Sequence, residues 1–198
     1  MKTHNIPNYP WPFNLDEVCH YAYWENFLSK KECEQIVSMG KIKGLKEGQS
    51  SYNNKKYNKY RECLISWLSP DDDLDWLYRR VTDVVNDLNN NYFKFDLYGI
   101  IEGLQFTNYK APSGKFDAHI DKIHKYQTRK LSITIQLSDS KDYEGGEFHL
   151  LTGKNPEIFD KTQGKLFAFP SYHLHRVTPV TKGERNALII WITGPNFK

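Results

Sequence analysis

Three residues with side chains that can bind a metal are spaced so that they could form one reactive metal site. Two of them, His119 and Asp121, are separated by a single residue, and the third, His175, lies much further along the chain. Two neutral imidazoles and one carboxylate on one side of a metal leave its other side open, which suits non-haem iron(II) and oxygen chemistry. The pattern therefore predicts a metal site at which oxygen could react.

The short spacing of the first two residues is what a β-strand requires. Side chains two apart on a strand project from the same face, so His119 and Asp121 could reach one ion without distortion of the backbone. His175 must then come from another strand, as in a jelly roll, where strands distant in sequence lie side by side. A His-x-Asp pair alone is a weak signal, because in an arbitrary chain it is more often two surface residues.

Arg185 adds a charge that such a site could use. A guanidinium fork can hold a carboxylate through two parallel hydrogen bonds. An arginine on the strand after His175 could therefore bind the far end of a dicarboxylate that chelates the metal. Taken by itself, Arg185 would instead be a surface residue in the turn that begins at Lys182.

The elements that must position these residues are mostly strands. From about Tyr98 onward, short strands are expected over residues 131–137, 147–151, 165–169 and 186–192. The first of these alternates apolar and polar residues, so one face would meet a hydrophobic layer and the other would line a polar cavity. Many short strands without alternating helices predict a mainly β fold with supporting helices and a double-stranded β-helix core, the cupin-like jelly roll.

Two helices are expected in the first hundred residues. Ser29 and Glu32 have the spacing of a capping box, and Gly40 could close that helix in the left-handed conformation. A second helix is expected to begin at Ser69 and to run as an apolar stripe to Leu88. Both would serve as scaffolding.

Length and composition limit the other possibilities. We expect one domain, in which residues 1–97 form a helical and mixed support region packed on a core of residues 98–198. A net charge of +3 gives no expectation of nucleic acid or membrane as partner. No signal peptide or transmembrane stretch is evident, which predicts a cytoplasmic protein. Cys19, Cys33 and Cys63 lack a CxxC spacing and are expected to be reduced thiols.

The segment around the distal histidine carries a family resemblance. The run 174–185, preceded by Tyr143–Glu147, resembles the iron(II)- and 2-oxoglutarate-dependent oxygenases of the prolyl 4-hydroxylase superfamily, especially their PKHD-type branch. The resemblance covers roughly Leu104 to Trp191. It implies Fe(II), 2-oxoglutarate and O₂ as cofactor and co-substrates, with ascorbate as a further candidate.

The resemblance also implies roles for single residues. It makes His119, Asp121 and His175 the iron ligands and Arg185 the partner of the distal carboxylate of 2-oxoglutarate. Prolyl 4-hydroxylases proper usually have lysine at that last position, so the arginine agrees with the PKHD-type members. Tyr109 matches the family tyrosine that hydrogen-bonds 2-oxoglutarate.

Two further positions point to the substrate. Arg129 and Trp191 match residues that line the peptide site of prolyl 4-hydroxylases, whereas Phe116 stands where those enzymes commonly have tyrosine. The resemblance thus implies hydroxylation of a peptide or protein, with proline as the expected target and succinate and CO₂ as products.

Other functions remain open at this point. The same ligands could hold zinc or manganese in a non-catalytic cupin, although such a protein would not need Arg185. A nucleic-acid oxygenase would carry a second arginine in an Arg-x5-Arg pattern, which is absent after Arg185. An oxygenase acting on a small molecule is a third possibility.

The remaining residues of interest are expected to be peripheral. His173 would be a structural residue at the mouth of a strand, and His124 and His149 would be surface groups or neighbours of the metal ligands. The segment 47–61 is expected to be an exposed loop, and the segments 47–61 and 139–144 are candidates for a lid that closes on substrate.

Overall fold

The computed structural model describes residues 19–48, 60–71, 73–121, 123–124 and 127–197. The elements in chain order are β1 (Ala22–Trp24), α1 (Lys30–Ile42), β2 (Lys46–Glu47), β3 (Arg61–Glu62), β4 (Leu64–Leu68), α2 (Asp75–Leu88), a π-helical turn η1 (Asn89–Phe93), β5 (Leu104–Lys110), β6 (Lys115–His119), β7 (Ile123–His124), β8 (Gln127–Gln136), β9 (Tyr143–Gly145), β10 (Phe148–Leu150), β11 (Glu157–Ile158), β12 (Leu166–Pro170), β13 (His175–Val177) and β14 (Val180–Gly194).

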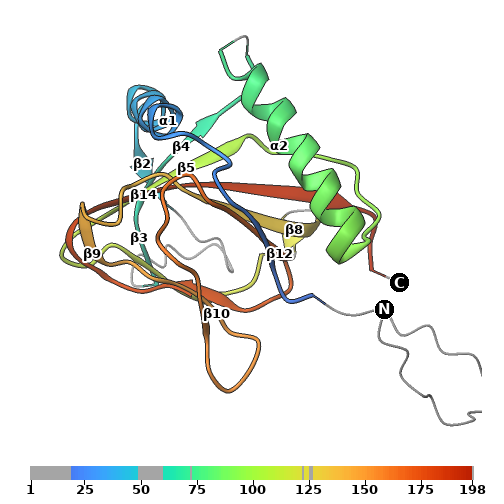
Figure 1. The fold of residues 1–198 in the computed structure, drawn as a ribbon. Coiled ribbons are helices and arrows are strands. Elements are labelled where there is room, and N and C mark those ends of the chain that lie inside the picture. The colour runs from blue at the N-terminus through green and yellow to red at the C-terminus, as the bar shows by residue number, and fades with distance from the viewer. Residues whose placement is uncertain (1–18, 49–59, 72, 122, 125–126, 198) are drawn as a thin grey trace, which may run out of the picture.

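Two antiparallel sheets form the core of the described chain. The larger has the strand order β1-β12-β8-β14-β5-β4-β2, with β7 paired to β8 and β9 paired to β14. The smaller has the order β11-β10-β13-β6-β3. It lies below the larger sheet in Figure 1. The predicted mainly β jelly-roll fold is confirmed.

Both long helices cover the outer face of the larger sheet (Figure 1). The buried stripe of α2 packs there against the apolar side chains of β8 and β14. A second, more aromatic cluster, which includes Phe148 and Phe169, lies between the two sheets. Neither α1 nor α2 covers the inner face of the larger sheet, which can therefore carry polar side chains.

Helix α1 begins as its capping box predicts. The Ser29 hydroxyl accepts a hydrogen bond from the Glu32 backbone N–H at 3.3 Å, and the Ser29 backbone N–H donates to the Glu32 carboxylate at 2.8 Å. The expectation that Gly40 closes this helix is wrong, because the helix continues to Ile42. A Cβ at Gly40 would lie 2.3 Å from Cγ of Phe106, so glycine is needed there for close packing on β5.

Helix α2 starts later than Ser69, so that part of the prediction is also wrong. The backbone N–H groups of Leu74 and Asp75 both donate to the carbonyl of Asp71, at 3.0 Å and 2.9 Å, which forms a separate turn before the helix. At the other end the helix stops at Leu88 as expected.

Strand β8 shows the predicted alternation and one irregularity. Ile133 and Ile135 join the core under the helices, whereas Thr134 lines a cavity on the inner face. The register with β14 shifts near Arg129, so one residue is left without a partner between it and Leu131. Such a bulge changes the face to which a side chain points. It brings Arg129 to the inner face beside Trp191.

The first part of the chain contributes strands as well as helices. β1, β2 and β4 extend the larger sheet, and β3 extends the smaller one. The three cysteines are free thiols. No helix within the described residues combines the length and the apolar character that crossing a bilayer requires. Residues 49–59 of the expected lid, and the N-terminal stretch examined for a signal peptide, lie outside the described residues.

Candidate active site

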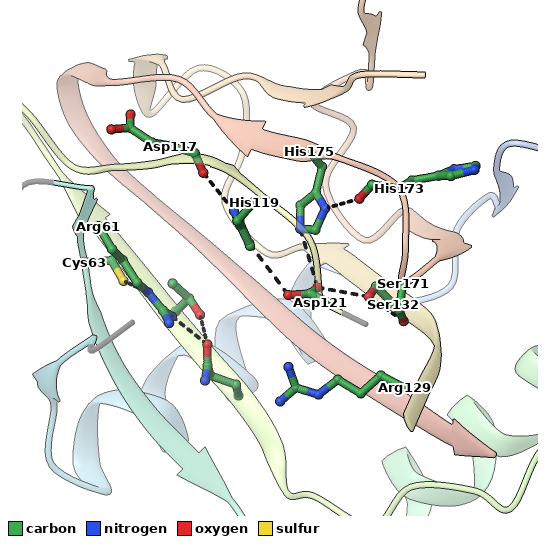
Figure 2. A network of polar contacts seen from close by, with 12 residues as sticks. Arg61, Cys63, Asp117, His119, Asp121, Arg129, Ser132, Ser171, His173 and His175 are labelled. Carbon is green, nitrogen blue, oxygen red and sulfur yellow. Dashed lines mark hydrogen bonds and ion pairs between the residues drawn. The ribbon is translucent and has the colours of Figure 1, made fainter. Parts of the chain in front are cut away.

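Three side chains converge between the two sheets, and they come from the positions that the spacing predicts (Figure 2). Oδ1 of Asp121 lies 3.7 Å from Nε2 of His119, and Oδ2 lies 3.4 Å from Nε2 of His175. His119 ends β6 and pairs directly with His175 at the start of β13. The three potential ligand atoms lie within 4.8 Å of one another.

Backbone carbonyls orient both imidazole rings. Nδ1 of His119 lies 2.8 Å from the carbonyl oxygen of Asp117, and Nδ1 of His175 lies 3.0 Å from that of His173. A carbonyl only accepts, so each Nδ1 carries a proton and donates it. Both Nε2 lone pairs therefore point toward the Asp121 carboxylate. The lone pairs and the negative carboxylate repel one another, and a divalent cation between them would attract all three groups. The donor set therefore fits a metal.

Burial sets the charges of the three groups. It lowers the pKa of His119 to about 4, and the neighbouring imidazole of His175 acts in the same direction. Burial acts to raise the pKa of Asp121, but His175 and His119 outweigh it and hold that pKa below its usual range. At neutral pH the group thus has a neutral His119 and an anionic Asp121, the forms that bind a divalent metal.

Aromatic rings surround the two histidines. The ring of Phe116 stacks on His119 with 3.5 Å between centroids. The Arg61 guanidinium lies over the Phe116 ring, 4.6 Å from its centroid. Phe169 contacts His175 edge-on at 4.9 Å. These rings pack against the imidazoles and restrict their rotation, and His175 is almost fully buried.

A cavity adjoins the three residues, and Arg185 lies in its wall. Arg185 is only 3% exposed, and its Nη1 has no hydrogen-bond partner among the described residues. An unsatisfied donor on a buried cation is costly unless an anion binds there. The cavity therefore brings together three side chains that could hold a metal and a guanidinium that could bind a carboxylate.

The Tyr143–Glu147 segment makes room for Arg185. Gly146 has φ +59°, and a Cβ there would lie 3.1 Å from Cδ of Arg185. The Tyr143 hydroxyl accepts a hydrogen bond from Nε2 of Gln136 at 2.8 Å. The absence of a side chain at Gly146 thus leaves room for the Arg185 stem, beside which Tyr143 and Gln136 lie.

The sequence of this chain is similar to that of known proteins. The profile of the 2OG-Fe(II) oxygenase superfamily matches residues 104–193. A PKHD-type hydroxylase of Prochlorococcus marinus is 29% identical over 176 residues, covering 84% of this chain and 75% of that protein. Another, of Alteromonas mediterranea, is 47% identical over 62 residues, covering 31% of this chain and 27% of that protein. The profile and these relatives support a 2OG-Fe(II) oxygenase of the PKHD type.

Solved structures show that the oxygenase has the fold of the prolyl hydroxylases. A Pseudomonas putida prolyl-4-hydroxylase is 18% identical with a TM-score of 0.71, over 89% of this chain and 94% of that one. A prolyl hydroxylase of Trichoplax adhaerens, solved with a hypoxia inducible factor peptide, is 20% identical with a TM-score of 0.74, over 88% and 84% of the two chains.

Arg129 and Trp191 lie together at the edge of the oxygenase cavity. Nε and Nη2 of Arg129 donate to the two carboxylate oxygens of Glu102 at 2.7 Å and 2.6 Å. The guanidinium also stacks 3.7 Å from the centroid of Trp191. Glu102 was missed by the sequence analysis, since a lone acidic residue in a loop gives no signal. The ion pair holds the indole against the cavity.

Arg61 is the second residue that the sequence analysis missed. It was placed in an exposed loop, which is wrong, because it is 9% exposed and lines the cavity. Its Nη2 donates to Oε1 of Gln105 at 2.7 Å, and its Nε donates to Sγ of Cys63 at 3.0 Å (Figure 2). Only the pairing of β3 with β6 brings it to the site.

The other histidines lie outside the three-residue group. His149 is buried between Arg176, which donates to its Nδ1, and Glu147, 3.0 Å from its Nε2, so it is not a surface residue. His173 is partly buried and orients His175 through its backbone carbonyl. The side chain of His124 lies outside the described part of the chain.

Proposed function

We propose that this oxygenase hydroxylates a peptide or protein substrate at proline and converts 2-oxoglutarate to succinate and CO₂. The observation that carries the proposal is the buried Arg185, whose Nη1 has no partner among the described residues, in the same cavity as His119, Asp121 and His175. A zinc cupin without a co-substrate would have no use for that cation.

His119, Asp121 and His175 would hold Fe(II) through two Nε2 atoms and one carboxylate oxygen. Iron(II), when bound, supplies the activation of O₂ coupled to oxidative decarboxylation of 2-oxoglutarate. The protein contributes position. The carbonyls behind the imidazoles fix the direction of both lone pairs, and the carboxylate supplies the only negative charge of the set.

Arg185 and Tyr109 would bind the distal carboxylate of 2-oxoglutarate. Both line the cavity, and the pKa of Tyr109 is raised, chiefly by burial, so its hydroxyl remains protonated and can donate. A buried guanidinium facing a carboxylate gives strong, directional hydrogen bonds. The co-substrate would thus be oriented with its other end toward the metal site.

The peptide would bind at the edge formed by Trp191 and Trp67. Trp191 lines the cavity, and the two indoles lie 6.1 Å apart between centroids. Trp67 is 42% exposed, so an aromatic surface leads from solvent to the cavity. Flat apolar rings of this kind suit the pyrrolidine ring of proline, and the Arg129–Glu102 pair would hold Trp191 in place.

The test is a turnover assay on the full chain with Fe(II), 2-oxoglutarate, O₂ and ascorbate. A library of proline-containing peptides is read by mass for the gain of one oxygen atom and, in parallel, for succinate. We expect oxygen gain on a proline-containing peptide with matching succinate. Succinate release with small molecules alone, and none with peptides, would contradict the peptide assignment.

Two variant sets test the site itself. Anaerobic addition of Fe(II) and 2-oxoglutarate should give a metal-to-ligand charge-transfer band, which His119→Ala should abolish. Arg185→Met should weaken 2-oxoglutarate binding by about 100-fold, because it removes one member of a buried charge pair. Arg185→Lys is the matched control and should retain part of the affinity. An unchanged Michaelis constant for 2-oxoglutarate in Arg185→Met would remove the role of Arg185.

A further inference from the structure

A pair of buried hydroxyl groups lies directly behind the Asp121 carboxylate (Figure 2). Ser132 Oγ donates to Oδ2 of Asp121 at 2.9 Å, and Ser171 Oγ lies 3.0 Å from Ser132 Oγ. Ser132 is 1% exposed and Ser171 is fully buried. Neither residue belongs to the three proposed ligands.

We propose that Ser132 and Ser171 are positioning residues that keep Asp121 a monodentate ligand, bound through one carboxylate oxygen. The metal would thereby keep its remaining coordination positions open for the co-substrates. This inference rests on the proposed function, because it concerns how the Asp121 carboxylate would bind the metal. It assigns a task to two side chains that do not touch the metal or the co-substrate.

The direction of the two hydrogen bonds follows from counting protons. Ser132 Oγ donates to Oδ2 of Asp121, so its single hydroxyl proton is committed to that bond. Ser171 must then donate its own proton to the oxygen of Ser132. The two hydrogen bonds therefore run in one direction, from Ser171 to Ser132 and from Ser132 to Oδ2. Hydrogen bonds that end on a carboxylate are stronger than those between neutral groups.

The backbone ties the same residues together. The N–H of Asp121 donates to the carbonyl of Ser171, and the N–H of Ser171 donates to the carbonyl of Lys130, both at 2.9 Å. Ser171 follows the last residue of β12, and Lys130 is the bulged residue of β8. Asp121 lies beyond the end of β6 and is therefore fixed from the opposite sheet by both its backbone and its side chain.

The chain leaves the two carboxylate oxygens unequal. Oδ2 lies 3.4 Å from Nε2 of His175 and also accepts the hydrogen bond of Ser132, whereas Oδ1 lies 3.7 Å from Nε2 of His119 and accepts no hydrogen bond from either serine. If both oxygens turned to the ion, the carboxylate would occupy one of the positions that 2-oxoglutarate and O₂ need. The Ser132 hydrogen bond competes with the ion for Oδ2 and would thus leave that position of the metal to the co-substrate.

The experiment loads the full chain anaerobically with Co(II), whose visible absorption reports the number of ligands. The variants are Ser132→Ala and Ser171→Ala, and Ser132→Thr keeps a hydroxyl at the first position. The matched control is Ser66→Ala. Ser66 is also a buried serine of the larger sheet, but its hydroxyl donates to the Gly40 carbonyl on the helix side.

In Ser132→Ala we expect the Co(II) absorption to change toward that of a higher coordination number. The 2-oxoglutarate affinity of the loaded protein should fall by about 10- to 100-fold, the usual effect of removing an outer partner of a ligand. Ser171→Ala should change the Co(II) absorption and the 2-oxoglutarate affinity in the same direction, but by less. Ser132→Thr should have wild-type absorption and affinity. Ser66→Ala should lower thermal stability and leave both unchanged.

The outcomes separate this inference from the proposed function. If wild-type protein binds Co(II) and 2-oxoglutarate while Ser132→Ala has the wild-type spectrum and affinity, the inference is overturned and the proposed function stands. A loss of thermal stability alone in Ser132→Ala would also overturn it, since the serine would then be only structural. Wild-type protein that binds neither ligand would overturn both.

Discussion

The guanidinium of Arg185 lies over the ring of Tyr109, 5.4 Å from its centroid, and the two residues are direct partners in the register of β14 and β5. The tyrosine is 3% exposed. One cross-strand pair thus places a cation and a phenol side by side in the cavity wall. The affinity for a dicarboxylate should depend on both.

Tyr109→Phe should weaken 2-oxoglutarate binding by about 10-fold, because one hydrogen bond to a charged group is lost. Fe(II) affinity should not change, since Tyr109 is not among the metal-binding residues. Anaerobic titration of the charge-transfer band measures both constants. Tyr98→Phe, at a 71% exposed tyrosine, is the control and should behave as wild type. Equal affinity in Tyr109→Phe and wild type would show that the phenol does not contact the co-substrate.

Tyr143→Phe should disturb Arg185 indirectly. Burial raises the pKa of Tyr143 even though the Arg185 cation beside it acts to lower it, and the hydroxyl accepts from Gln136. Its loss leaves the Gln136 amide and Arg185 without this acceptor. We expect a Michaelis constant for 2-oxoglutarate raised by about 3- to 10-fold, with little change in Fe(II) affinity. A raised dissociation constant for Fe(II), with no change for 2-oxoglutarate, would instead show that Tyr143 acts on the metal site.

Gly40→Ala should destabilise the protein by about 1–3 kcal/mol, because the new methyl group collides with Phe106 in a close-packed core. Gly153→Ala is the matched control, since a Cβ there meets nothing within 4 Å, and its effect should stay within about 0.5 kcal/mol. Denaturant unfolding measures both. Equal stability of the two variants would show that helix α1 can move away from β5 at little cost.

Glu32 should make stability depend on pH in the acid range. Its pKa is lowered from 4.5 to about 2, mainly by a hydrogen bond from Arg80, with burial opposing and Ser29 assisting. The folded pKa is below the unfolded one, so this stabilisation is complete above pH 4.5 and is lost as the pH falls toward about 2.

Glu32→Gln should therefore remove about 1 kcal/mol at neutral pH and flatten the decline in stability between pH 4.5 and about 2. Glu34→Gln, at an exposed position of the same helix, should leave that decline in place. Urea unfolding across this pH range is the measurement. An unaltered acid slope in Glu32→Gln would assign the decline to other groups.

Features that depend on local periodicity could be predicted from the sequence. The two-residue step from His119 to Asp121, the alternation along β8 and the capping box of Ser29 and Glu32 each reflect a repeat or contact within a few residues. The shared face of His119 and Asp121 and the mainly β fold follow from such patterns, because strand and helix geometry fix which neighbours share a face. His175 lies far away in the sequence, and its role was implied by the family resemblance.

Partners that meet across elements could not be predicted in this way. Glu102 reaches Arg129 because a bulge in β8 changes the face of the arginine, and Arg61 reaches the cavity because β3 pairs with β6. Gly40 was wrongly predicted to end a helix, because glycine is needed there to make room for the Phe106 ring, which comes from another element.

By itself, the sequence determined which side chains could bind a metal and a dicarboxylate, since their types and spacing carry that chemistry. Tertiary structure alone decided how the Asp121 carboxylate is held. Ser132 and Ser171 lie far apart in sequence and meet only where β12 ends beside β8. The physical reason is that strand register and bulges are set by packing over the whole sheet, and no short stretch of residues encodes them.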